Sequence, residues 1–225
     1  MGTNPELVAL MLADARLPTG GHTQSAGLEP AVLAGLGADG NKLGEIEEYA
    51  RDRSRTVTRV EAGAAVVARY FALSGLELTP VERAWAARTP SQALRAASRR
   101  QGRAYLRLAG RVWPGVLEHL PGDGEIARPV VVGVVGAVTG LSAVQTARLI
   151  GYEDAQTVVA ASLKLLPVDP VDAACWLTAL HPEIEELADA VRGLTGPGEI
   201  PACGAPLVDV FGQKHAAERM RLFHA

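Results

Sequence analysis

Seven side chains in this 225-residue sequence are of the types that bind transition metals. They are His22, His119, His181, His215, His224, Cys175 and Cys203. No two of the histidines lie four residues apart and no His-Glu-x-x-His sequence occurs, so we predict no closed metal site. Imidazole and thiolate nevertheless suit divalent transition metals. His22 in a glycine-rich segment, and His215 with Cys203 and His224 near the C-terminus, are therefore weak candidates for transient metal contact.

Motifs for catalysis are incomplete. No Gly-x-x-x-x-Gly-Lys-Ser/Thr sequence occurs, which argues against a self-contained nucleotide hydrolase. Ser25 lies in a segment that resembles a nucleophile elbow, but Thr23 stands where the elbow requires glycine, so we predict that Ser25 caps a helix. His181 and Glu183 match half of a zinc deaminase signature, whereas Cys203 lacks the second cysteine of the other half. We therefore predict that the chain is not an enzyme.

The charge of the chain is unevenly distributed. Apolar residues make up 48% of the sequence and charged residues 21%, which is typical of a soluble globular protein. The formal net charge is −3, yet residues 81–120 contain eight arginines against two acidic residues. This segment is predicted to face an acidic surface, on a partner or on the chain itself. Nucleic acid is not an expected partner, because the whole chain is acidic and only 4% aromatic.

The sequence also predicts where the protein works. Two cysteines cannot form a disulfide framework, and we find no charged and apolar cleavable leader at the N-terminus. The longest apolar run, residues 129–138, is too short to span a bilayer. We therefore predict a cytoplasmic protein with no membrane contact.

Start and stop signals divide the chain into helices. Proline at a first helical position and small polar capping residues mark most of the starts, and glycine or proline marks most of the ends. Helices are predicted to begin near residues 4, 25, 79, 91, 169 and 181, and to cover 43–73, 129–138, 143–166 and 206–223. The valine-rich run at 129–138 favours a strand, but no second such run exists to pair with it, so we predict a buried helix. The fold class is predicted as all-α, one domain over residues 1–225 with roughly ten helices.

The helix that begins near Ser91 carries a stripe of arginines. Arg95, Arg99, Arg103, Arg107 and Arg111 follow one another at intervals of four residues, so they lie along one side of the helix. Apolar and small residues occupy the other side, which predicts one packed face and one charged face.

Several local sequences, in this order along the chain, resemble the urease accessory protein UreF family. They are LPTGGHTQSAGLE at 17–29, SRRQGRAYLRLAG at 98–110, RPVVVGVVGAVTGL at 128–141, ASLKLLPVDPVDA at 161–173 and PLVDVFGQKHAAERMRLFHA at 206–225. The first and last are the specific ones, and together the five run nearly from end to end. The chain departs from the family pattern at His22, where members often have an aromatic residue, and at Ala225, where serine is usual.

The resemblance implies an all-helical, dimeric adaptor without catalytic activity. Members of this family bind a second accessory protein, UreD (also called UreH), through the C-terminal region. Together the two recruit the GTPase UreG to apo-urease, into which nickel is inserted. No cofactor is expected to be bound stably, and contact with nickel is expected to be transient at most.

The resemblance also implies which residues contact partners. Arg221 matches the family's C-terminal arginine, which is implicated in partner recruitment. The further candidates from the N-terminal and C-terminal motifs are Gly20, His22, Ser25, Glu29, His215, Leu222 and Phe223. Gly20 and Gly27 are expected to serve the backbone, by allowing a turn and a close helix approach. Glu29 is expected to pair either with an arginine of the stripe or with a partner. The apolar C-terminal segment is expected to fold back or to dock on a partner.

Two other functions stay open at this point. The chain is alternatively a metallochaperone that binds nickel directly through His22, His215 and Cys203. A third possibility is a GTPase-activating regulator of UreG that supplies an arginine from the stripe. Arginines at regular helical spacing are more often solvated or in salt bridges, which weighs against the third.

Overall fold

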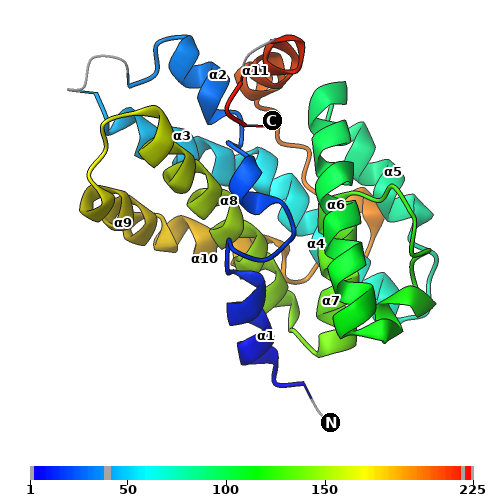
Figure 1. Cartoon of the computed structure of the whole chain (residues 1–225). Coiled ribbons are helices and arrows are strands. Elements are labelled where there is room, and N and C mark those ends of the chain that lie inside the picture. Colours follow the sequence, from blue (N-terminus) through cyan, green and yellow to red (C-terminus); the bar gives the residue numbers. More distant parts are fainter. Residues whose placement is uncertain (1–2, 38–41, 219–220, 224–225) are drawn as a thin grey trace.

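The computed structural model describes residues 3–37, 42–218 and 221–223, and over these residues helices joined by loops make up the fold (Figure 1). The α-helices are α1 (Pro5–Leu12), α2 (Leu28–Leu33), α3 (Glu45–Arg55), α4 (Val57–Leu73), α5 (Thr79–Ala87), α6 (Gln92–Val112), α7 (Arg128–Thr139), α8 (Ala143–Leu165), α9 (Pro170–Ala179), α10 (His181–Val191) and α11 (Pro206–Ala217). Three short 3-10 turns join them, η1 (Gly21–Thr23), η2 (Pro114–Glu118) and η3 (Pro197–Glu199). The described part of the chain contains no strand, which confirms the all-α class with roughly ten helices.

Four of the predicted helix starts carry side-chain capping hydrogen bonds, from Asn4, Ser91, Ser142 and Asp169. The Asn4 side chain accepts from the Glu6 amide, and the Ser91 side chain accepts from the Leu94 amide. Ser142 forms a full capping box, in which its side chain and that of Gln145 each accept from the other residue's backbone amide. These bonds satisfy amide groups that have no partner inside the first turn of a helix.

The single long helix predicted over 43–73 is wrong. The helix is interrupted at Thr56, whose backbone angles (φ −123°, ψ −95°) are not helical, so that α3 and α4 are separate. The Thr56 hydroxyl donates to the Asp52 carbonyl at 2.6 Å. Thr157 makes the same bond to the Glu153 carbonyl inside the unbroken helix α8, so this bond alone does not explain the break.

The valine-rich run forms a buried helix, as predicted. α7 packs against α4 along small residues, and the contact at Gly133 is so close that a Cβ there would lie 2.2 Å from the Ala65 carbonyl oxygen. Residues Pro129 to Val135 are all buried. This pairing forms the centre of the main apolar core. Within the described residues, no helix is both long and apolar enough to cross a membrane.

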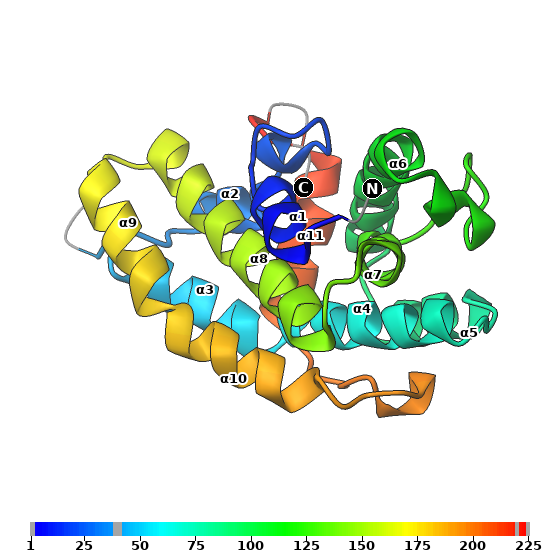
Figure 2. The same ribbon diagram turned by 90° about the horizontal axis from the view of Figure 1, so that it is seen from below.

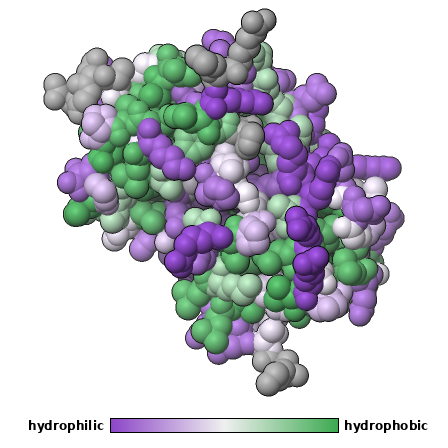
Figure 3. All heavy atoms as spheres, in the orientation of Figure 1, coloured by the Kyte–Doolittle hydropathy of each residue, from purple (hydrophilic) through white to green (hydrophobic). Residues whose placement is uncertain are grey.

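The remaining helices lie on two sides of the N-terminal segment. α8 packs with α3, α9 and α10 on one side, and α6 packs with α7 on the other (Figure 2). Between these sides lie α1, the loop that leads to η1, and α11 (Figure 2). In the space-filling view, hydrophilic residues gather over α6, and hydrophobic residues gather at the end of the molecule where α1 lies (Figure 3).

Candidate partner-binding site

Glu29 is the residue that connects the two specific motifs of the sequence. It lies in α2, it is only 5% exposed, and its carboxylate accepts three hydrogen bonds from the C-terminal region. The donors are the Leu222 amide at 2.7 Å, the Phe223 amide at 3.0 Å and His215 Nε2 at 2.8 Å. The Glu29 carboxylate therefore does not bond to an arginine of the stripe, and it does not face outward toward a partner. It holds the end of the chain against the N-terminal motif.

The C-terminal segment is only partly the helix that was predicted. α11 ends at Ala217 rather than at Phe223, and Glu218 has an extended backbone (φ −69°, ψ 137°). Residues 221–223, which we call the strap, then run back toward Glu29. Phe223 is 3% exposed and packs in the second apolar core, beneath Lys164 Nζ at 5.2 Å from the ring centroid. The helix ends early because amide bonds to a buried carboxylate replace the backbone bonds of a further turn.

Two strap residues face outward. Leu222 is 72% exposed, whereas its neighbour Phe223 is buried. Arg221 is also exposed, and its guanidinium donates to the His215 carbonyl at 3.3 Å. A groove of about 570 Å³ lies between α6 and α11 with Arg221 at its edge, lined by Gln92, Ala93, Ala96, Arg100, Gln213 and Ala216. Arg221 supplies an exposed cation at the edge of this groove, so the chemistry of that edge suits an acidic partner surface.

The glycines of the N-terminal motif serve the backbone, as predicted. Gly20 and Gly27 have positive φ angles of 78° and 77°, which side chains with a Cβ rarely adopt. A Cβ at Gly27 would also lie 2.9 Å from the Tyr49 hydroxyl, which donates to the Ala26 carbonyl. Gly20 therefore allows a turn within the N-terminal loop, and Gly27 allows the loop to approach α3 closely.

Ser25 does not have the role that was predicted. α2 begins at Leu28 with Gly27 at its N-cap position, and the Ser25 side chain makes no capping bond. Ser25 is fully buried, and its hydroxyl has no hydrogen-bond partner among the described residues. A buried side chain of this kind cannot contact a partner directly while the loop keeps this conformation.

The three weak metal candidates differ in their surroundings. His22 is exposed in η1, Cys203 is half-buried against the main core, and His215 is fully buried beside Glu29. His224 lies outside the described residues. Across the described ranges, no three His, Cys, Asp or Glu side chains converge as a metal site.

Three of the five stripe arginines bind within the chain. Arg95 donates to the carbonyls of Thr89 and Pro90, Arg99 pairs with Glu82, and Arg103 pairs with Glu125. The other two, Arg107 and Arg111, are exposed near the end of α6 and form no ion pair with the described residues. Arg99 and Arg103 therefore neutralise acidic groups of their own chain, and Arg95 bonds to backbone carbonyls.

A buried ionic network was not predicted from the sequence. Arg53 of α3 donates to both carboxylate oxygens of Asp154 in α8, at 2.5 and 3.0 Å, and Thr58 of α4 donates to the same carboxylate at 2.7 Å. Burial tends to raise the pKa of Asp154, but the charge and hydrogen bonds of Arg53, with the Thr58 bond, outweigh it and lower the pKa. The two sides of this pair lie 101 residues apart in the sequence, so only the fold brings them together.

A second part of the network surrounds Arg128, at the start of α7. Its guanidinium pairs with Glu61 and lies 3.6 Å from a Glu153 oxygen, and the Tyr105 hydroxyl donates to the other Glu153 oxygen. Burial raises the pKa of Glu153, although Arg128 and Tyr105 act in the opposite direction. A single carboxylate inside an otherwise apolar helical stretch, as at Glu61, indicates a buried charge in the sequence. The local sequence does not show which residue pairs with that charge.

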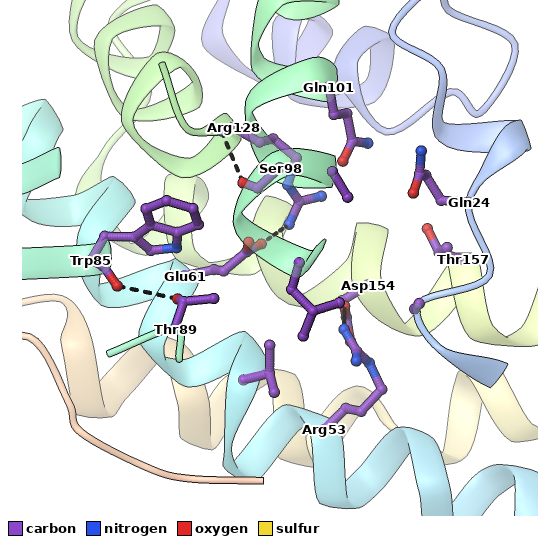
Figure 4. A pocket seen from close by; sticks show the side chains of 14 residues that line it. Gln24, Arg53, Glu61, Trp85, Thr89, Ser98, Gln101, Arg128, Asp154 and Thr157 are labelled. Carbon is purple, nitrogen blue, oxygen red and sulfur yellow. Dashed lines mark hydrogen bonds and ion pairs between the residues drawn. The ribbon is translucent and has the colours of Figure 1, made fainter. Parts of the chain in front are cut away.

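Two cavities, the inner and the outer chamber, lie along this network, and both polar and apolar groups line them. The inner chamber, about 90 Å³, is lined by residues that include Arg53, Glu61, Trp85, Arg128 and Asp154 (Figure 4). The outer chamber, about 230 Å³, is lined by residues that include His22, Glu153, Lys164 and Phe223. The two chambers share the lining residues Gln24, Gln101, Arg128 and Thr157, so they adjoin. Because each buried carboxylate has an arginine beside it, the network acts as a set of cross-links between helices.

Comparison with known proteins identifies the family. A family model described as UreF matches residues 42–181. The chain is 39% identical to the urease accessory protein UreF of Mycobacterium sp. (strain JLS) over 219 residues, which is 95% of this chain and 96% of the relative. It is 38% identical to the UreF of Mycolicibacterium vanbaalenii, over 95% of this chain and 96% of the relative. Against the UreF of Mycobacterium tuberculosis (strain H37Rv) the identity is 37%, over 95% of each chain. The chain therefore belongs to the UreF family of urease accessory proteins.

Proposed function

We propose that this chain is a non-catalytic adaptor that joins UreD and the GTPase UreG to apo-urease in the cytoplasm while nickel is inserted. The family membership supports a role in urease maturation. The adaptor role is our inference from the arrangement of the surface. Its basis is the strap, which displays Arg221 and Leu222 outward while Glu29 holds its backbone in place.

The strap is suited to recognition because it is ordered before a partner arrives. A segment that must fold on binding loses affinity through the conformational entropy of ordering. Here two amide bonds to Glu29 and the burial of Phe223 already order the segment. Arg221 is then held at the edge of the groove between α6 and α11, where a partner carboxylate can reach it.

The test is a recruitment assay with Arg221→Ala. UreD and a tagged UreG are co-expressed with either the wild-type chain or the variant, and the amounts that co-purify are compared. We expect the variant to keep its helical content and to lose UreG by about tenfold or more, because a hydrogen bond to a charged group contributes about 1.5–3 kcal/mol. Arg83→Ala, at an exposed arginine of α5 that does not line the groove, is the matched control. Equal recovery of UreG with both variants would refute the role of Arg221.

A homodimer is proposed from a second surface. Leu7 and Leu10 of α1 are 63% and 71% exposed, and Leu10 borders an apolar groove that is also lined by Leu149 and Ile184. Exposed leucines beside an apolar groove on the same face offer the self-complementary contact that a two-fold interface requires. Light scattering on the purified chain measures the mass. A mass of one chain at tens of micromolar would argue against this proposal.

Direct nickel binding and activation of UreG remain the alternatives. We propose that nickel meets this chain only transiently, through His22 at the surface. Equilibrium dialysis that finds one tightly bound nickel per chain would favour the metallochaperone instead. Activation of UreG would draw on Arg107 or Arg111, the two stripe arginines that are exposed without an ion pair in the described structure. Measuring GTP turnover by UreG with and without this chain decides that alternative.

A further inference from the structure

The helix α6 carries a large positive charge of its own. Over its full length it contains six arginines and no acidic residue. An acidic residue four positions from a basic one on a helix surface is stabilising, and like charges at that spacing are destabilising. Arg103, Arg107 and Arg111 follow one another at this spacing, so they repel one another. The opposite charge must come from outside the helix.

The described part of the chain supplies only some of that charge. Glu125 pairs with Arg103, but both side chains are more than half exposed (68% and 54%), and an ion pair so exposed to water contributes little. Arg107 and Arg111 are exposed and pair with none of the described acidic residues. The C-terminal half of α6 therefore presents positive charge to solvent.

These arginines lie on the same face of α6 as the groove beside Arg221. The exposed positions of this face are Gln92, Ala96, Arg100, Arg103, Arg107 and Arg111, which we call the outer face of α6. At about 100° per residue they fall within an arc of about 100°, so they form one continuous stripe. The first three line the groove, and the others continue beyond it. Figure 3 shows hydrophilic residues gathered over this helix. The candidate partner site thus continues along α6, which is about 31 Å long.

An exposed apolar side chain borders the arginines. Leu117 of η2 is 47% exposed. It packs on α6 at Gly110, where an added Cβ would lie 3.2 Å from the Leu117 side chain. Gly110 is three residues after Arg107 and directly before Arg111, so Leu117 flanks the outer face. Cations beside an exposed apolar side chain suit a protein partner, because a protein surface supplies both carboxylates and apolar groups.

Nucleic acid fits this face less well. Proteins that bind single strands stack the bases on exposed aromatic rings. Tyr105 is the one aromatic residue of α6, and it is 1% exposed and donates to Glu153 on the inner side. The positive stripe is also short, because the exposed Glu118 follows Leu117 directly. A long phosphate backbone would meet that carboxylate, whereas a short acidic segment can end before it.

We propose that the outer face of α6 binds an acidic, amphipathic helix of the same partner that reaches Arg221. Carboxylates one turn apart on that helix face Arg107 and Arg111, which are about 6 Å apart along the axis of α6. Its apolar residues cover Leu117. Arginine can hold a carboxylate through two parallel hydrogen bonds, so each contact fixes position as well as adding attraction. Only the identity of the partner, UreG, rests on the proposed function.

A peptide titration on the isolated chain tests this chemistry without UreG. The probe is a fluorescent synthetic helix with glutamate at every fourth position and leucine on the adjacent face. Its matched control has glutamine in place of each glutamate. Fluorescence anisotropy gives the two affinities. We expect the glutamate peptide to bind about tenfold more tightly or better, and the difference to shrink as salt is added, because salt screens exposed charges.

Charge reversal places the bound peptide on α6. Arg107→Glu with Arg111→Glu should weaken binding of the glutamate peptide by about tenfold or more, because like charges then face each other. Arg55→Glu with Arg192→Glu makes the same change in net charge at exposed arginines away from α6, and should stay within about twofold. Glutamate is unfavourable near the C-terminus of a helix. The milder Arg107→Gln with Arg111→Gln is therefore measured too, and should weaken binding by about threefold.

The same variants are then tested in co-expression with UreD and a tagged UreG. Recovery of UreG should fall with Arg107→Glu and Arg111→Glu together, and should stay unchanged in the control. Equal affinity of the wild type and both α6 variants for the glutamate peptide would overturn the proposed surface. So would tighter binding of a short DNA oligonucleotide than of that peptide.

The outcomes also separate this surface from the proposed function. Unchanged recovery of UreG with the charge-reversal variant would overturn the α6 surface, even where Arg221→Ala releases UreG and the adaptor role stands. If the wild-type chain recovers no UreG, the proposed function fails, and the peptide titrations alone decide whether α6 binds an acidic helix.

Discussion

Asp154→Asn tests the buried network that connects α3, α4 and α8. The substitution removes the charge that faces Arg53, whose side chain is 7% exposed, and leaves that guanidinium buried without a counter-charge. Asparagine also keeps only one acceptor oxygen, where the carboxylate accepts two bonds from Arg53 and one from Thr58. Breaking a buried ion pair by removing one partner costs about 3–5 kcal/mol. Folded domains have a total stability of about 5–15 kcal/mol, so this variant should unfold at a much lower urea concentration.

The assay is urea unfolding followed by circular dichroism at neutral pH. Two controls accompany it. Asp14→Asn removes the carboxylate of a pair with Arg16 at the surface and should leave the midpoint unchanged. The double variant Arg53→Met with Asp154→Leu removes both charges and should recover most of the lost stability, because well-packed apolar residues replace such pairs at little cost. A loss below about 1 kcal/mol in Asp154→Asn would show that the network is not a cross-link.

The same pair predicts a pH dependence. Because Arg53 lowers the pKa of Asp154, the carboxylate stabilises the folded state above the unfolded-state value of 3.8. This contribution is lost as the pH falls from that value through the lower folded value. The difference in unfolding free energy between the wild type and Asp154→Asn should therefore shrink below pH 4, and a constant difference would contradict the assigned shift.

Two further substitutions test the packing of the fold. Gly102→Ala should lower the free energy of unfolding by about 1–3 kcal/mol, because the added Cβ would lie 2.0 Å from the Ile126 carbonyl oxygen. The control Gly44→Ala, which has no atom within 4 Å of its added Cβ, should lower it far less. Similar urea midpoints for both variants would refute the close contact at Gly102. Ser25→Ala should keep or raise the thermal midpoint, since it removes a buried hydroxyl that has no partner in the described structure, and a clear fall in the midpoint would show that the hydroxyl is bonded.

Local signals in the sequence predicted the helices well. The capping residues Asn4 and Ser91 mark helix starts that depend only on neighbouring residues, and the structure confirms both. The helix over 129–138 was also predictable, because a valine run without a partner strand must be buried in another way. The break at Thr56 was not predicted, because no glycine or proline marks it in the sequence.

The site could be predicted only in part. The motifs named Glu29, His215 and Arg221, but they did not show that Glu29 and His215 form a buried pair, because 186 residues separate them. Nothing in the local sequence distinguished Glu29 from a solvated carboxylate near an arginine stripe. The pair between Arg53 and Asp154 was missed because its two residues also lie far apart in the sequence. A charged residue inside a helix can be predicted to be buried only when its partner is known.

Co-assembly in the absence of added nickel is the most direct test of the claim that this chain works through its surfaces. The chain is expressed with UreD and UreG, and the mixture is separated by size exclusion with the nickel content of each fraction measured. We predict that the three proteins elute together and that Arg221→Ala separates UreG from the other two. If instead the chain elutes alone and carries one tightly bound nickel, its function is metal binding, and the adaptor role is contradicted.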